Sequence, residues 1–151
     1  MSGLDLDDLQ ALLRSALRTL PHARYALYHL PPGSDGRRFL ASTVDDVTSA
    51  AEREATVATQ VALTATGLSG LGVPSVITDG FADEFLAGIT GPGRSRFLGD
   101  APEDWRWGRA DQDSVDLLVI TYAARVDLLP AGAIQGHGDA EFMHGRSRQK
   151  T

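Results

Sequence analysis

The sequence contains no cysteine, so the chain cannot form disulfides, thiolate metal sites or a cysteine nucleophile. It also lacks any apolar run near the roughly 20 residues that a membrane-spanning helix requires. Its formal net charge is -6, and its basic residues are scattered until a short cluster at Arg146, Arg148 and Lys150. Nucleic-acid binding requires a concentrated basic face. These absences predict that neither nucleic acid nor a membrane is a partner.

The amino terminus also lacks the pattern of a secretory signal. Residues Met1 to Asp5 are acidic, where a signal peptide would be basic and then apolar. We therefore expect a cytoplasmic protein. With 151 residues, 42% of them hydrophobic and 23% charged, the chain has the balance of one soluble globular domain that can bury a core without a metal.

Three segments have the composition of strands. Residues 23–30 are rich in aromatic side chains and lie between prolines, and residues 60–65 form a shorter apolar run. In residues 115–122, Leu117 alternates with Leu118 and the pattern continues apolar on both sides, so we expect both faces of this strand to be covered.

Helices are predicted where leucines or valines recur at helical spacing. Residues 4–20 place leucines three and four apart, which predicts an amphipathic helix from Leu4 to Leu20. A second helix is expected from the N-cap Thr43 to Glu54, and a short one over residues 82–89.

Glycine and proline mark turns at residues 31–36 and 67–74, the latter with at most one helical turn. Residues 90–114 form a long polar stretch, which we expect Trp105 and Trp107 to hold in place by packing. The last residues, 130–151, contain little that could form a core, and we interpret them as a mobile tail.

Several segments, in order and over roughly residues 9–123, together resemble the first domain of dye-decolourising (DyP-type) haem peroxidases. The segments are Leu20-Pro21-His22-Ala23-Arg24-Tyr25, residues 62–74, residues 84–89, Phe97-Leu98-Gly99-Asp100, residues 102–108 and residues 117–123. The resemblance implies an α+β, ferredoxin-like domain, an antiparallel sheet with helices packed on one face, over residues 1–124, with a divergent, flexible tail over residues 125–151. It also implies an alternative for residues 4–20, which in the family are largely an extended lead-in to the first strand.

In a ferredoxin-like domain a second long helix and a fourth strand should follow residues 115–122. The sequence instead offers residues 125–130 and then a glycine-rich stretch, and Pro130 excludes an uninterrupted helix. We therefore expect an incomplete fold in which the last helix and strand are missing. The strand beginning at Ala23 would then have an unpaired edge, which favours association with another chain. A truncated gene, a frameshifted gene and a genuinely split protein would all produce this ending.

The chemistry that the resemblance implies belongs to the second half of the family's longer chain. There, a histidine ligates the haem iron, and an aspartate in a Gly-x-x-Asp-Gly motif acts with an arginine on peroxide. Residues 33–36 are one residue too short for that motif, and residues 76–80 lack its first glycine, so both are interpreted as turns. No catalytic residue, cofactor-binding residue or metal ligand is assigned.

Three residues in the tail have the spacing of a zinc site. His137, Glu141 and His144 would share one face of a helix. The adjacent glycines disfavour a helix, and a solvated tail is the preferred interpretation. His22 and His29, beside and within the first strand, are candidates for an axial haem ligand, with a structural role preferred for each.

The remaining candidates each have a simpler structural interpretation. Five aromatic residues could relay electrons but are more simply core and loop anchors: Trp105, Trp107, Tyr25, Tyr28 and Tyr122. Asp100, Glu103 and Asp104 are close in sequence but most simply form a solvated loop. Residues 67–72 contain Gly-x-x-Gly-x-Gly without the lysine or context of a phosphate loop.

These observations lead to one hypothesis and two alternatives. The chain would be the N-terminal part of a DyP-type haem peroxidase, a family that oxidises dyes and phenols with peroxide. It would be inactive alone, with haem as the family's cofactor and none bound by this chain. The alternatives are a non-catalytic dimerisation or interaction module and one half of a split peroxidase. The expected partners are accordingly a second copy of the chain or a separately encoded C-terminal half.

Overall fold

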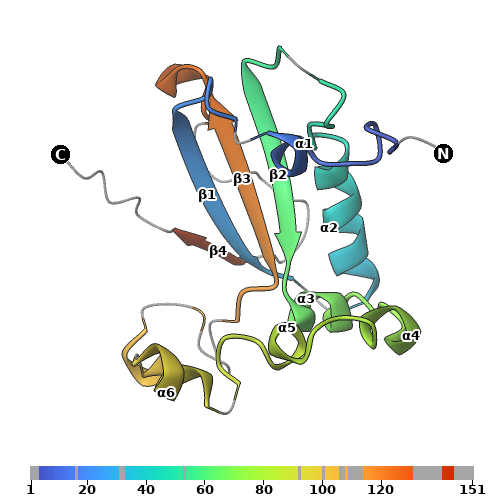
Figure 1. The fold of residues 1–151 in the computed structure, drawn as a ribbon, viewed down its shortest axis with the longest axis vertical. Helices are drawn as coiled ribbons and strands as arrows, with labels where there is room; N and C mark the ends of the chain where they lie inside the picture. The colour runs from blue at the N-terminus through green and yellow to red at the C-terminus, as the bar shows by residue number, and fades with distance from the viewer. Residues whose placement is uncertain are drawn as a thin grey trace.

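A computed structural model of the chain describes residues 4–15, 17–30, 33–52, 54–91, 93–99, 101–105, 108, 114–130 and 141–144, with the backbone alone at residues 95 and 141–144. It contains an antiparallel sheet with helices packed against it, which confirms the predicted α+β class (Figure 1). Among the described residues, none of the helices combines the length and apolar character that crossing a bilayer would take.

The centre of the sheet is formed by three strands, β1 (His22–His29), β2 (Val57–Leu63) and β3 (Leu117–Ala123). β3 lies between the other two and pairs antiparallel with both. β1 and β2 therefore run in the same direction, joined by a helix, as in the split β-α-β unit of ferredoxin-like folds. All three predicted strands are confirmed, with their ends shifted by one to three residues.

A fourth strand, β4 (Glu141–His144), pairs antiparallel with residues 26–29 of β1, so the sheet order is β2-β3-β1-β4. Among the described residues, β4 pairs with four of the eight residues of β1, which is consistent with the incomplete fold that the sequence predicts. Between β3 and β4, the described residues hold only the short 3-10 helix η2 (Val126–Leu128), so the expected lack of a second long helix holds for them. The predicted tail cannot be assessed over residues 131–140 and 145–151, which lie outside the described residues.

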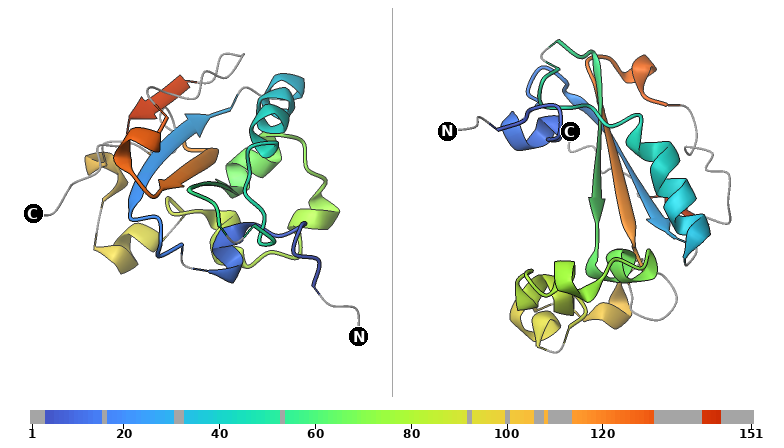
Figure 2. Two further views of the ribbon diagram at one scale, coloured as in Figure 1. Left: turned by 90° about the horizontal axis from the view of Figure 1, so that it is seen from above. Right: turned by 90° about the vertical axis from the view of Figure 1, so that its right-hand side faces the viewer.

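Helix α2 (Ser34–Val44) covers one face of the sheet, and the core lies beneath it. The right-hand view in Figure 2 shows this helix lying along the sheet. Tyr28, Phe39, Leu117 and Val119 are at most 1% exposed there, and the rings of Tyr28 and Phe39 pack with centroids 5.0 Å apart. We call this the closed face.

The sequence placed this helix about ten residues too late. Of the turn predicted at 31–36, Gly33 is a turn residue, residues 34–36 instead begin α2, and residues 31–32 lie outside the described residues. The helix predicted from Thr43 to Glu54 is wrong, because α2 ends at Val44. Thr43 is not an N-cap: its hydroxyl is buried and donates to the carbonyl of Phe39 within α2. The chain then turns toward β2, and the amide of Thr48 donates to the carbonyl of Thr59.

Residues 4–20 do not form the predicted long helix. Only α1 (Ala11–Arg14) is helical, and Leu17 has a φ of 48°. The side chain of Gln10 exchanges hydrogen bonds with the backbone of Val61, and the buried Gln60 accepts from the amide of Leu12. These bonds dock the segment on the β2 edge, which favours the extended alternative over the helix.

Four short helices gather at the end of the sheet where β2 ends and β3 begins (Figure 1). They are α3 (Ala65–Gly70), α4 (Ser75–Thr78), α5 (Asp83–Ala87) and α6 (Arg94–Leu98), followed by η1 (Pro102–Asp104). The short helix predicted over 82–89 is confirmed as α5. The turn predicted at 67–74 is largely helical in its first half, since α3 continues to Gly70.

Candidate functional site

The second face of the sheet carries apolar side chains that alternate with those of the core. Leu27 pairs with Leu118 in register, and Tyr25 pairs with Ile120. Leu27 is buried, the side chains of Leu118 and Ile120 are half-buried, and Tyr25 is 46% exposed. In the right-hand view of Figure 2, α1 at one end and the α5–α6 region at the other lie on this side. We call it the open face.

Two tyrosines lie together on the open face. Burial raises the pKa of the Tyr122 phenol above 10.0, and the charge and hydrogen bond of the neighbouring Tyr25 raise it further. Tyr28, the third predicted relay tyrosine, is instead on the closed face, because residues 25 and 28 point to opposite sides of one strand. The three tyrosines among the five aromatic candidates therefore lie on two different faces of the sheet.

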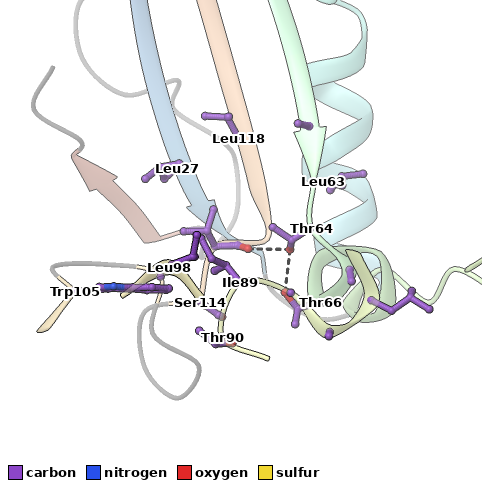
Figure 3. A pocket seen from close by; sticks show the side chains of 17 residues that line it. Leu27, Leu63, Thr64, Thr66, Ile89, Thr90, Leu98, Trp105, Ser114 and Leu118 are labelled. Carbon is purple, nitrogen blue, oxygen red and sulfur yellow. Dashed lines mark hydrogen bonds between the residues drawn. The ribbon is translucent and has the colours of Figure 1, made fainter. Parts of the chain in front are cut away.

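A cavity of about 740 Å³ lies where the open face meets the segment from α5 to η1 (Figure 3). Leu27 and Leu118 line it from the sheet. Ile89, Leu98 and Trp105 line it from the opposite segment. The volume falls within the range of about 300–1,000 Å³ that small-molecule sites occupy. This cavity is the candidate site of the described chain.

A polar cluster lies beside the cavity at the end of β1. The Nδ1 atom of His29 is 2.7 Å from Oδ2 of Asp116 and 2.9 Å from Oγ of Ser114, and Ser114 also lines the cavity. Asp116 is buried and accepts a second bond, 2.9 Å long, from the amide of Leu30. A catalytic triad would need the serine and the carboxylate on different imidazole nitrogens. The cluster is therefore no triad, although it contains the same three residue types.

The two candidate haem ligands lie at opposite ends of β1. His22 is exposed at the start of the strand, where it pairs with Ala123. The side chain of His29 is 53% exposed, and its Nδ1 is the atom held by Asp116. Neither histidine is part of the cavity lining, which contains no imidazole and no cationic side chain among the described residues.

The described residues do not form the helix that the zinc hypothesis required. Glu141 and His144 lie at the two ends of a strand, so the shared helical face that it required does not exist there. His137 lies outside the described residues. Across the part of the chain that the structure describes, no group of three or more metal-binding side chains comes together.

The other predicted candidates do not form a site. Glu103 and Asp104 are exposed on η1, and Asp100 and Trp107 lie outside the described residues. In the glycine-rich segment, Gly67 packs so closely that an added Cβ would come within 2.3 Å of the carbonyl oxygen of Asp116. That glycine serves helix packing against β3 rather than phosphate binding.

Large apolar side chains are also exposed on the short helices outside the cavity. Phe97 is 94% exposed and Val76 81%, and the rings of Phe81 and Phe85 pack against each other with centroids 5.0 Å apart. Exposed apolar side chains that cluster, as Phe81 and Phe85 do, commonly mark a contact with another molecule. We call the exposed apolar side chains of α4, α5 and α6 the helical apolar patch.

Sequence reasoning missed the residues that define the site. Asp116 and Ser114 precede β3, and the acidic residue immediately before a strongly apolar strand was the available signal. Ile89 and Leu98 belong to segments that the sequence analysis singled out, but nothing in those segments indicated that the two side chains line a cavity. No protein-family model matches the chain, and a search of curated proteins found no match either.

Proposed function

We propose that this chain is the N-terminal, ferredoxin-like half of a DyP-type haem peroxidase and that it is inactive without the half that holds haem. The observation that carries the proposal is the unequal covering of the sheet. One face has a complete core beneath α2, whereas Tyr25, Ile120 and Leu118 on the other remain partly exposed. A sheet face of this composition normally packs against a further layer of protein. The sequence resemblance supplies the identity of that layer.

Haem does not fit the cavity as the described residues form it. Haem iron needs a protein ligand such as an imidazole nitrogen, and the two propionates of the porphyrin are anionic. The described lining offers neither an imidazole nor a cation to them. The proposal therefore places iron, peroxide chemistry and dye or phenol oxidation on the other half, and we derive no catalytic step for the residues of this chain.

Titration of the purified chain with ferric haem tests the inactivity. We expect no sharp Soret band, no saturation at one haem per chain and no oxidation of a phenol when peroxide is added. One-to-one uptake with a defined ferric spectrum and peroxidase turnover would refute the proposal.

A non-catalytic dimerisation or interaction module is the second candidate, and the helical apolar patch favours it. Sedimentation velocity over a range of concentrations separates the two. Self-association that is lost in Phe97→Asp but retained in Ile120→Asp would locate a dimer interface on the patch and support the module. A monomer at all concentrations would instead support the first proposal, in which the open face binds a different polypeptide.

A further inference from the structure

The cavity beside β1 and β3 has a chemical character that the proposed function does not use. Seventeen of the described residues line it, and none of these is charged (Figure 3). Leu27, Leu118, Ile89 and Leu98 provide most of an apolar wall, drawn from the sheet on one side and from the α5–α6 segment on the other. An ion moved from water into such surroundings without a partner loses much of its solvation free energy. A neutral occupant is therefore favoured.

One hydrogen-bond donor of the lining belongs to Ser114. Asp116 Oδ2 is 2.7 Å from His29 Nδ1, and because an ionised carboxylate can only accept, this nitrogen carries the shared proton. The Oγ of Ser114, 2.9 Å from the same nitrogen, then meets an N–H group and can act only as an acceptor toward it. The hydroxyl hydrogen of Ser114 is left to donate elsewhere, and Ser114 lines the cavity.

A second donor belongs to Trp105. Its indole Nε1 is buried and has no hydrogen-bond partner among the described residues, and the residue lines the same cavity. An indole N–H can only donate. A buried donor without a partner costs roughly as much free energy as a lost hydrogen bond, so an acceptor placed nearby would be stabilised.

Two of the three threonines in the lining, Thr64 and Thr66, are already committed. The Thr64 hydroxyl donates to the carbonyl of Val115 over 2.8 Å and accepts from the amide of Gly67 over 3.1 Å. Since its hydrogen is used, the Thr66 hydroxyl 2.9 Å away donates to it, as the dashed lines in Figure 3 trace. Ser114 and Trp105 thus each bring an uncommitted hydrogen to the described lining.

We propose that this cavity binds a small, neutral, largely apolar molecule that carries a carbonyl-type acceptor oxygen. The apolar walls hold the hydrocarbon part, and the two donors select the oxygen. The cavity volume of about 740 Å³ accommodates a molecule of two or three fused rings or a short acyl chain. A side chain inserted from another polypeptide is the competing occupant, and the binding experiment with the isolated chain separates the two.

Equilibrium dialysis of the full chain against three matched probes tests the proposal. Acetylnaphthalene is neutral with a carbonyl, ethylnaphthalene has nearly the same shape without the oxygen, and naphthoate adds a negative charge. We expect acetylnaphthalene to bind about three- to tenfold more tightly than ethylnaphthalene, the contribution of one or two neutral hydrogen bonds. Naphthoate should bind more weakly than either.

Variants locate the site and its donors. Ser114→Ala and Trp105→Phe should each reduce the preference for acetylnaphthalene over ethylnaphthalene, and Ala62→Trp, at an exposed position of the lining, should reduce binding of both. Phe97→Ala is the matched control, because Phe97 is 94% exposed and does not line the cavity. Circular dichroism and urea unfolding check that each variant folds.

Three outcomes would overturn the proposal. They are the absence of probe binding to the folded chain, equal or tighter binding of naphthoate, and a loss of binding in Phe97→Ala as large as in Ala62→Trp, which would indicate adsorption to the helical apolar patch. None of these measurements involves haem or peroxide. The ligand proposal and the peroxidase proposal can therefore fail separately.

Discussion

The two faces of the sheet are built by the same strands yet differ in how completely they are covered. On the closed face, α2 lies over Tyr28, Leu117 and Val119 and excludes water from them. On the open face, Leu118 and Ile120 alternate with those residues along β3. Short described segments cover this face at either end, and Tyr25 stays 46% exposed. The comparison teaches that apolar alternation sets what a strand can bury, whereas the elements packed against it decide what is buried.

Leu117 and Leu118 allow the sharpest test of this comparison, since adjacent leucines in β3 point to opposite faces. Leu117→Ala should lower the free energy of unfolding by about 2–5 kcal/mol, because it leaves a cavity in a core with no exposed surface. Leu118→Ala should cost about 1–2 kcal/mol, because the side chain is already partly in contact with water. Urea unfolding of both variants measures the difference. Equal losses would show that the open face is as well sealed as the closed one.

Gly67 and Gly70 test the junction where both faces meet α3. A Cβ at Gly67 would lie 2.3 Å from the carbonyl oxygen of Asp116, whereas a Cβ at Gly70 would meet no atom within 4 Å. Gly67→Ala should therefore lower the free energy of unfolding by about 1–3 kcal/mol through forced backbone movement. Gly70→Ala should leave it unchanged or raise it by about 0.4–1 kcal/mol. The close approach would be disproved by two variants with the same urea midpoint.

The smallest expected effect is a pH dependence that arises from the open face. The pKa of Tyr122 is raised above 10.0, so the folded state holds this proton more tightly than the unfolded state does. The resulting stability is fully present below the unfolded pKa and is lost as pH rises through the folded one. The urea midpoint should therefore fall more between about pH 8 and about pH 11 for the wild-type chain than for Tyr122→Phe.

Tyr25→Phe sharpens the same experiment. Because burial is the larger cause of the shift and Tyr25 the smaller, this variant should reduce the pH dependence without abolishing it. A wild-type chain and a Tyr122→Phe variant with the same pH dependence would place the origin of alkaline destabilisation elsewhere.

The strands were the most predictable part of the fold. Residues 117–122 have apolar side chains on both sides, and β-branched and large apolar residues are enriched in strands. The helical spacing of the leucines in residues 4–20 led to a wrong helix prediction. Hydrogen bonds of Gln10 and Gln60, which form only in the folded sheet, hold this segment in a different conformation. Local periodicity could not anticipate bonds between residues about fifty positions apart.

Most of the candidate site could not be predicted from the sequence. Trp105 and His29 were recognised as residues of interest, but their sequence separation of more than seventy positions hid the cavity between their segments. Asp116 had no apparent role until β1 and β3 paired and brought Leu30 and His29 to its carboxylate. The predicted metal site of residues 137, 141 and 144 depended on a helix, and its last two residues lie in a strand instead.

The sequence by itself determined the α+β class, the three main strands and the absence of cysteine chemistry, because alternation and composition are properties of neighbouring residues. Tertiary structure decided where α2 begins, which face stays open, and how Ser114 and Trp105 come to line one cavity. These outcomes depend on long-range hydrogen bonds and on the packing of distant segments, whose free energies are not encoded in any short window of residues.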